Sequence, residues 1–225
     1  TCDVDGDGEL DGLCIIHAGF GQEMNGNPAS CIWSHQWSIG TAKTYDGVRA
    51  SLYHTEPDMR GLASNSSTHG ITRVGTICHE TGHFLGLPDL YDYGNDSNGL
   101  GKFCLMSGGG WGGNQGNQPT HMSAWCKTYL GWIVPDEISR TGSYSLPCIE
   151  KNAKLFKLQG NLPANEYFLV ENRQGHGFDA ATPGTKRGLL IYHVDDKAWY
   201  GLGQSSRVND DQNHYMVDLE EASGT

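Results

Sequence analysis

Five consecutive residues, His79 to His83, form the motif H-E-x-x-H, whose residue types suit metal-dependent hydrolysis. On a helix, side chains four positions apart lie on the same face, so His79 and His83 can bind one zinc ion at about 2.0–2.1 Å. Glu80 then lies beside the metal and can take a proton from a water molecule that attacks there. The motif therefore predicts a helix that carries two zinc ligands and a general base.

A third zinc ligand is expected shortly after the motif. In metzincin-type peptidases a glycine turns the chain sharply, and the next ligand stands three residues later. Gly86 can make that turn because glycine tolerates positive φ, and Asp89 then occupies the ligand position, where histidine is more usual. No glutamate follows the motif until Glu137, which argues against a thermolysin-like ligand set. Asp89 is the first candidate, and His121 and Asp92 are the alternatives.

One further segment fits the same kind of site. The sequence Leu-Met-Ser-Gly-Gly around Met106 is typical of a Met-turn, in which a methionine packs beneath the metal as an apolar floor. The histidines without metal-ligand spacing are interpreted as structural or surface residues; in the N-terminal half these are His17, His35, His54 and His69.

Acidic side chains alternate near the start of the chain, with glycine at the sixth position of an EF-hand-like loop. The predicted calcium ligands are Asp3, Asp5, Asp7, the Glu9 carbonyl and Asp11. Position twelve of this loop is Cys14 where an EF-hand has a bidentate glutamate, so another carboxylate or water must complete the shell. We expect at least one structural Ca²⁺, which would clamp the loop and protect it from self-digestion.

The elements that must position these residues mix helix and strand. The residue pattern predicts a buried strand over 13–18 and a helix over 68–86, which Ser67 or Thr68 caps and Gly86 with Pro88 ends. A glycine-rich loop region follows, and a second helix is expected over 120–130. The C-terminal part predicts short strands over 143–149, 153–159, 166–172, 187–194 and 214–220.

Composition excludes several classes of protein. Among 225 residues, 15 are basic and 26 acidic, so the net charge of −11 argues against nucleic-acid binding. The longest apolar runs are far shorter than the roughly 18–20 residues of a membrane helix, which predicts a soluble protein. Seven dispersed cysteines without C-x-x-C spacing indicate disulfides in an oxidising compartment, with one thiol left over.

Several segments, in order along nearly the whole chain, resemble the immune inhibitor A family of secreted zinc metallopeptidases. They are IIHAGFGQE, IWSHQW, HETGHFLGLPDLYD, LMSGGGW, AWCKTYLGW, EYFLVENRQ and GLLIYHVDD. The resemblance implies a metzincin-like catalytic domain that holds one zinc ion and cleaves internal peptide bonds. It also implies synthesis as a secreted precursor with a propeptide. By position, His79, His83 and Asp89 correspond to the ligands and Glu80 to the general base.

We therefore expect an α+β fold with a central zinc-binding helix, a Met-turn and a β-rich C-terminal part. Residues 1–225 are interpreted as one catalytic domain, with an upper part over 1–86 and a lower part over 87–225. Members of the family carry a segment before the acidic loop, so an N-terminal piece is expected to be missing here. The expected partners are protein or peptide substrates and the chain's own N-terminal segment or propeptide. Two alternative functions stay open: a non-catalytic, calcium-stabilised extracellular binding module, and a zinc hydrolase of non-peptide substrates.

Overall fold

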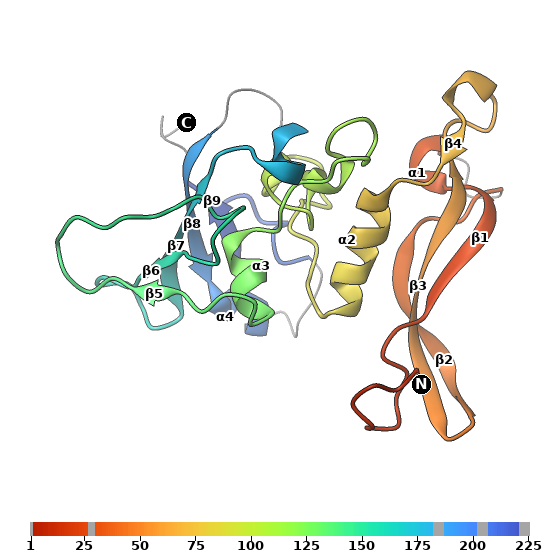
Figure 1. Ribbon diagram of the computed structural model, residues 1–225, viewed down its shortest axis with the longest axis horizontal. Coiled ribbons are helices and arrows are strands. Elements are labelled where there is room, and N and C mark those ends of the chain that lie inside the picture. Colours follow the sequence, from red (N-terminus) through yellow and green to blue (C-terminus); the bar gives the residue numbers. More distant parts are fainter. Residues whose placement is uncertain (1, 27–29, 182–186, 202–206, 221–225) are drawn as a thin grey trace. The chain divides into compact units, whose positions relative to one another are not determined.

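The computed structural model describes residues 2–26, 30–181, 187–201 and 207–220. It divides into two compact units, Thr1–Gly86 and Leu87–Thr225, each described below by itself (Figure 1). Within the described ranges, no helix combines the length and the apolar character needed to cross a membrane.

The first unit is built on a four-stranded sheet. Its elements are β1 (Cys14–Phe20), α1 (Gln22–Asn25), β2 (His35–Tyr45), β3 (Val48–Arg60), the 3₁₀ turn η1 (Ser66–Thr68), β4 (Gly70–Ile71) and α2 (Val74–Phe84). The strand order is β1-β3-β2, and β4 also pairs with β3. Strands β2 and β3 form a hairpin around Asp46 and Gly47, both at positive φ, as a two-residue turn requires. Strand β1 runs parallel to β3, so their pairing joins segments far apart in sequence.

The strand expected over 13–18 is present as β1, but the expectation that it is buried is wrong. Ile15 and Ile16 are 43% and 50% exposed. The reason is that β1 lies at the edge of the sheet: within the described ranges it pairs only with β3 along its length.

Helix α2 begins later than predicted. Its first residue is Val74, because Gly70–Ile71 pairs with Met59 and Arg60 of β3 as strand β4. The predicted caps Ser67 and Thr68 lie instead in η1, where the Asn65 side chain accepts a hydrogen bond from the Ser67 N–H at 3.2 Å. The predicted end is confirmed: the helix stops at Phe84, and Gly86 follows with φ of +90°.

The second unit contains a five-stranded sheet and most of the loops. Its strands are β5 (Asp136–Glu137), β6 (Phe156–Leu158), β7 (Glu166–Arg173), β8 (Gly188–Asp195) and β9 (Val217–Leu219), paired in that order. Its helical elements are η2 (Gly101–Phe103), η3 (Gly108–Trp111), α3 (Ala124–Tyr129), η4 (Gly177–Ala181) and α4 (Asp196–Gly201). Strands β6 to β9 are antiparallel neighbours, and β5 runs parallel to β6.

Two predictions for this unit need correction. Residues 143–149 form no strand. Two hydrogen bonds join them to β7, and both involve Asn172, so they make no continuous ladder. The Asn172 side chain donates to the Leu146 carbonyl, and the Asn172 carbonyl accepts from the Ile149 N–H, each at 2.8 Å. The helix expected over 120–130 begins only at Ala124, because the Ser123 side chain caps it by accepting from the Cys126 N–H at 3.3 Å. The predicted ranges 153–159 and 214–220 contain β6 and β9, and the ranges 166–172 and 187–194 overlap β7 and β8, each of which extends one residue further.

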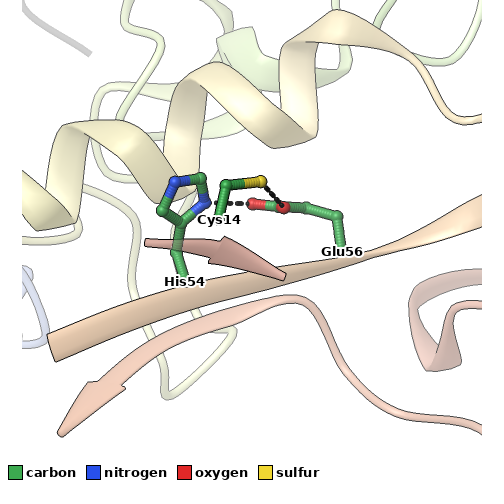
Figure 2. Close-up of side chains that lie close together, drawn as sticks. All are labelled: Cys14, His54 and Glu56. Atoms are coloured by element: carbon green, nitrogen blue, oxygen red, sulfur yellow. Dashed lines mark hydrogen bonds and ion pairs between the residues drawn. The ribbon is translucent and has the colours of Figure 1, made fainter. Parts of the chain in front are cut away.

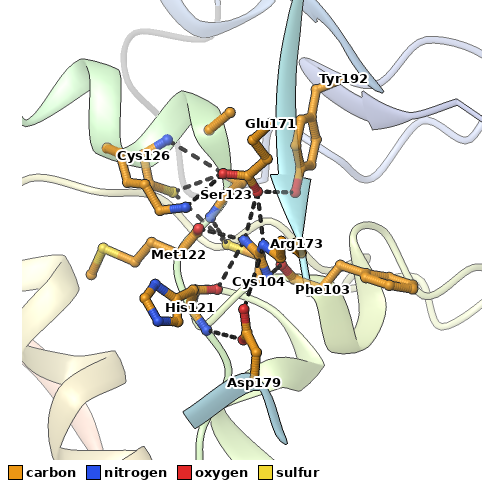
Figure 3. Close-up of polar contacts among 12 residues, drawn as sticks. Phe103, Cys104, His121, Met122, Ser123, Cys126, Glu171, Arg173, Asp179 and Tyr192 are labelled. Carbon is orange, nitrogen blue, oxygen red and sulfur yellow. Dashed lines mark hydrogen bonds and ion pairs between the residues drawn. The ribbon is translucent and has the colours of Figure 1, made fainter. Parts of the chain in front are cut away.

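A network of charged side chains lies in the core of the second unit, where alternate residues of β7 face inward (Figure 3). Glu171 is fully buried; its carboxylate accepts from Lys127 Nζ at 2.6 Å, from Arg173 Nε at 2.8 Å and from the Tyr192 hydroxyl at 2.9 Å. Burial raises the pKa of Glu171, but the charges of Arg173 and Lys127 outweigh burial, so the pKa lies below its usual range. The carboxylate is therefore ionised between two cations.

The guanidinium of Arg173 also fixes two loops (Figure 3). It donates to the carbonyl of Phe103 at 2.8 Å and to the carbonyl of Met122 at 2.6 Å. Planar guanidinium groups suit such multiple donation because their N–H directions are fixed. One side chain of β7 thus holds the chain on both sides of the segment that contains Met106.

All seven cysteines lie in the described ranges, and each is a free thiol there. Cys104 and Cys126, both fully buried, have their sulfur atoms 3.9 Å apart. The disulfides expected from the cysteine count stay a prediction.

The carboxylate of Glu150 organises the loop after β7 and gives a pH-dependent prediction. Its Oε1 accepts from the backbone N–H of Gln174 at 2.7 Å, of Gly175 at 2.8 Å and of His176 at 3.3 Å. Burial raises the pKa of Glu150, but the backbone hydrogen bonds outweigh it and the pKa is lowered. A lowered pKa contributes stability above the ordinary glutamate value of about 4.3, and this contribution is lost as the pH falls through the folded-state value.

Glu150→Gln should therefore be less stable than wild type at about pH 6, and the difference should shrink towards about pH 3. Urea denaturation at several pH values measures it. A difference between the two proteins that stays constant over this range would contradict the assignment.

Candidate metal centre

The two histidines of the H-E-x-x-H motif lie on α2 with their Nε2 atoms facing each other. The Nε2 atoms of His79 and His83 are 3.2 Å apart, and the rings are nearly perpendicular, at 89°. Two nitrogens that bind one tetrahedral zinc ion at about 2.0–2.1 Å lie roughly 3.3 Å apart. The first unit therefore holds this pair of donors at the spacing that a zinc ion requires.

Glu80 is placed on the same helix between the two histidines. Its side chain is buried, and the residue is only 6% exposed. The backbone hydrogen bonds of α2 fix the position from which this side chain starts. The helix thus presents two nitrogen donors and one carboxylate together, as the motif predicts.

Asp89 is the third predicted ligand and belongs to the second unit. It is 3% exposed, and its Oδ2 accepts a short hydrogen bond from the Tyr93 hydroxyl, which orients the carboxylate. A second tyrosine, Tyr91, is near the same carboxylate. Burial and the charge of Asp89 raise the pKa of Tyr91, so the Tyr91 hydroxyl is neutral. Sequence reasoning missed Tyr93; its only signal is its position four residues after Asp89.

The alternative ligand Asp92 is occupied by its own loop. Its carboxylate accepts from the backbone N–H of Gly94 at 2.5 Å, of Ser97 at 2.8 Å and of Asp96 at 3.2 Å. Hydrogen bonding to Asp96 and to this backbone lowers the pKa of Asp92 to about 2. These contacts give Asp92 a structural role in the turn and favour Asp89 over it as a ligand.

Met106, the residue of the predicted Met-turn, lies in a tight turn of the second unit. The N–H groups of Ser107 and Gly109 both donate to the Cys104 carbonyl at 3.0 Å, and the Met106 side chain is fully buried. The Met106 carbonyl accepts from Leu90 N–H at 2.7 Å. The turn is therefore attached to the residue that follows Asp89.

The acidic N-terminal loop brings three of its predicted ligands together. One oxygen from each of Asp3, Asp5 and Asp7 lies within 4.8 Å of the others. Gly6 and Gly8 have φ of +79° and +86°, which lets the loop turn tightly enough for this convergence.

The carboxylates of the last two predicted calcium-loop residues, Glu9 and Asp11, make other contacts. The Glu9 carboxylate pairs with Arg49 at 2.6 Å, a contact that lowers its pKa. The predicted calcium ligand of this residue is its backbone carbonyl. The Asp11 carboxylate accepts from Val4 N–H at 2.5 Å and closes the loop.

Residues 3–134 match the family described as the immune inhibitor A peptidase M6, catalytic domain. This match covers more than half of the chain and includes the helix α2 with its two histidines. The chain belongs to the immune inhibitor A peptidase M6 family. The resemblance stated from sequence motifs is thereby confirmed.

Two relatives of this M6 chain are metallopeptidases or bear the family's name. The pre-pro-metalloprotease PrtV of Vibrio cholerae serotype O1 is 33% identical over 145 residues, which cover 59% of this chain and 16% of that protein. Immune inhibitor A of Bacillus thuringiensis subsp. alesti is 36% identical over 141 residues, which cover 57% of this chain and 20% of that protein. The matched part of the chain thus spans a fifth or less of either relative.

Proposed function

We propose that this M6 chain is a zinc-dependent endopeptidase that acts outside the cell on protein or peptide substrates. The facing Nε2 atoms of His79 and His83, 3.2 Å apart on α2, are the observation that carries the proposal. They lie inside the range that matches a peptidase catalytic domain. The name of one relative, a metalloprotease, agrees with this activity.

Three side chains would hold the ion: His79, His83 and Asp89, with Met106 as the apolar floor. Only residues 84–88 separate Asp89 from His83, and Gly86 makes the positive-φ turn that a metzincin-like ligand loop requires. When bound, zinc would act as a Lewis acid on the scissile carbonyl and lower the pKa of the attacking water.

Glu80 performs the proton transfers in this proposal. Its carboxylate takes a proton from the attacking water, and the resulting carboxylic acid then gives that proton to the nitrogen of the leaving amine. Glu80 is buried and follows His79 directly on α2, which supports this role. We also propose that the whole chain folds as a single metzincin-like domain. Its own N-terminal segment or propeptide is proposed as an additional partner.

Chelation tests this function directly. The purified protein should cleave casein or gelatin, lose this activity with a zinc chelator, and regain it when zinc is added back. Zinc content measured by mass spectrometry should be at least one ion for each chain that retains His79 and His83. A protein without bound zinc would support a binding module, and a zinc-loaded protein that cleaves no peptide bond would support a hydrolase of other substrates.

We also propose that the loop of Asp3, Asp5 and Asp7 binds Ca²⁺, with the Glu9 carbonyl and Asp11 completing the protein ligands. The convergence of three carboxylate oxygens and the two positive-φ glycines support this. Binding to the folded state alone stabilises it by RT ln(1 + [Ca²⁺]/Kd), about 2.7 kcal/mol at a concentration 100 times the Kd.

Calcium at such a concentration should therefore raise the midpoint of thermal unfolding, and the combined change Asp3→Asn and Asp5→Asn should remove this effect. Asp46→Asn, at the exposed turn between β2 and β3, is the matched control and should respond to calcium like wild type. Differential scanning calorimetry with and without calcium makes the measurement. An equal response in all three proteins would count against the site.

A further inference from the structure

A thiol, an imidazole and a carboxylate meet on one face of the sheet in the first unit (Figure 2). Cys14 comes from β1, and His54 and Glu56 come from β3. In the parallel pairing of these strands, Cys14 stands directly opposite His54, so both side chains point to the same face. Glu56 lies two residues further along β3 and shares that face. The register of two rigid strands therefore sets the positions of all three groups.

The distances suit a single small cation. His54 Nδ1 lies 2.7 Å from Glu56 Oε1, and Cys14 Sγ lies 3.4 Å from Glu56 Oε2. The three ligand atoms all lie within 4.8 Å of one another. Ligand atoms around a tetrahedral zinc ion, at bond lengths of about 2.0–2.3 Å, are separated by roughly 3.3–3.8 Å. Side-chain rotations alone can open the contact between His54 and Glu56 to that spacing.

Burial and charge also favour a cation here. The Glu56 side chain is 0% exposed and that of His54 is 8% exposed, so the carboxylate is cut off from solvent. A buried carboxylate is costly unless charge or hydrogen bonds compensate it. One divalent cation with a thiolate, a carboxylate and a neutral imidazole carries no net charge, which removes that cost.

The chemistry of the donors selects the kind of cation. Thiolate and imidazole are ligands of zinc and related transition metals, whereas calcium and magnesium prefer sets of oxygen atoms. Cys14 is exposed, which gives an ion a path from solvent and leaves room for a water molecule as fourth ligand. The His54 ring also packs edge-on against Phe84, with centroids 6.1 Å apart, which restrains the imidazole.

We propose that Cys14, His54 and Glu56 form a second transition-metal site of the zinc type, separate in its ligands from His79 and His83. Its role is structural, because the ion would join β1 to β3 and so close a long segment of chain. This site does not depend on the proposed peptidase activity.

Cobalt provides a test that distinguishes the two sites. A thiolate bound to Co²⁺ gives a charge-transfer band in the near ultraviolet. The other proposed ligand set, His79, His83 and Asp89, contains no thiolate. The experiment uses the reduced full chain with Glu80→Ala, which prevents self-digestion. This protein should bind two equivalents of Co²⁺, one of which produces the band. A single equivalent that produces the band would support this site and count against the one on α2.

Substitutions then assign the band. Cys14→Ser should remove the band and one equivalent of cobalt, whereas the matched control Cys148→Ser, at another partly exposed thiol, should keep both. His54→Asn should weaken the binding of the band-producing cobalt at least about tenfold without changing the far-ultraviolet circular dichroism. Absence of a band in the parent protein, or a band that survives Cys14→Ser, would overturn the proposal.

Discussion

Replacing Glu80 by alanine should abolish peptide hydrolysis while the protein keeps its zinc. A general base or acid contributes about 10²–10⁴-fold to a reaction rate, and Glu80 serves both proton transfers in the proposed reaction. The histidines on α2 are unchanged in this variant, so their Nε2 atoms still face each other at the spacing for zinc. The measurement pairs turnover on casein with zinc content for the same preparation.

Two controls separate the role of Glu80 from that of a ligand or a surface charge. Asp89→Ala should lower zinc affinity together with activity, because it removes the proposed third ligand. Glu137→Ala changes the exposed carboxylate of β5 and should leave both quantities as in wild type. A Glu80→Ala protein that keeps more than about a tenth of wild-type turnover would contradict the assignment as general base.

The second large effect concerns stability and lies in the buried charge network. Glu171→Gln removes the carboxylate that accepts hydrogen bonds from Lys127, Arg173 and Tyr192, while it keeps the size of the side chain. Both cations remain buried without this partner. Removing one member of a buried ion pair costs about 3–5 kcal/mol, against a total stability of about 5–15 kcal/mol for a typical domain. Denaturation by urea should show this loss.

Glu166 provides a matched control on the same strand. Its carboxylate lies 3.4 Å from His193, and both side chains are about a quarter exposed, at 23% and 24%. Solvent screens such a pair, so Glu166→Gln should change the free energy of unfolding by less than about 1 kcal/mol. Equal losses in Glu166→Gln and Glu171→Gln would show that the buried position carries no special weight.

The secondary structure could be predicted where local pattern determines it. The end of α2 depends on Gly86, and the strands predicted over 153–159 and 166–172 follow from short apolar runs, so sequence was sufficient there. The start of α2 was predicted wrongly because β4 forms by pairing with β3, a contact between residues distant in sequence. The exposure of Ile15 and Ile16 likewise depends on which strands pair with β1, and a local run of apolar residues does not contain that information.

The same distinction applies to the sites. His79, Glu80 and His83 lie on one helix, so their proximity follows from helical periodicity alone. The contact of His54 and Glu56 with Cys14 depends instead on the register between β1 and β3. Sequence spacing predicts a structural or surface role for His54, because this residue lacks metal-ligand spacing. Register is set by the whole sheet, so this grouping could not be found from spacing.

Arg173 lies beyond the boundary of the family match but holds loops inside the matched range. The match ends at residue 134, but the side chain that holds the Phe103 and Met122 carbonyls comes from β7, well beyond that point. A chain cut after residue 134 would contain every proposed zinc ligand and still lose the donor that fixes the loops around Met106. The family match therefore covers the proposed zinc ligands, whereas the Arg173 contacts lead us to expect that a stably folded piece extends at least through β7.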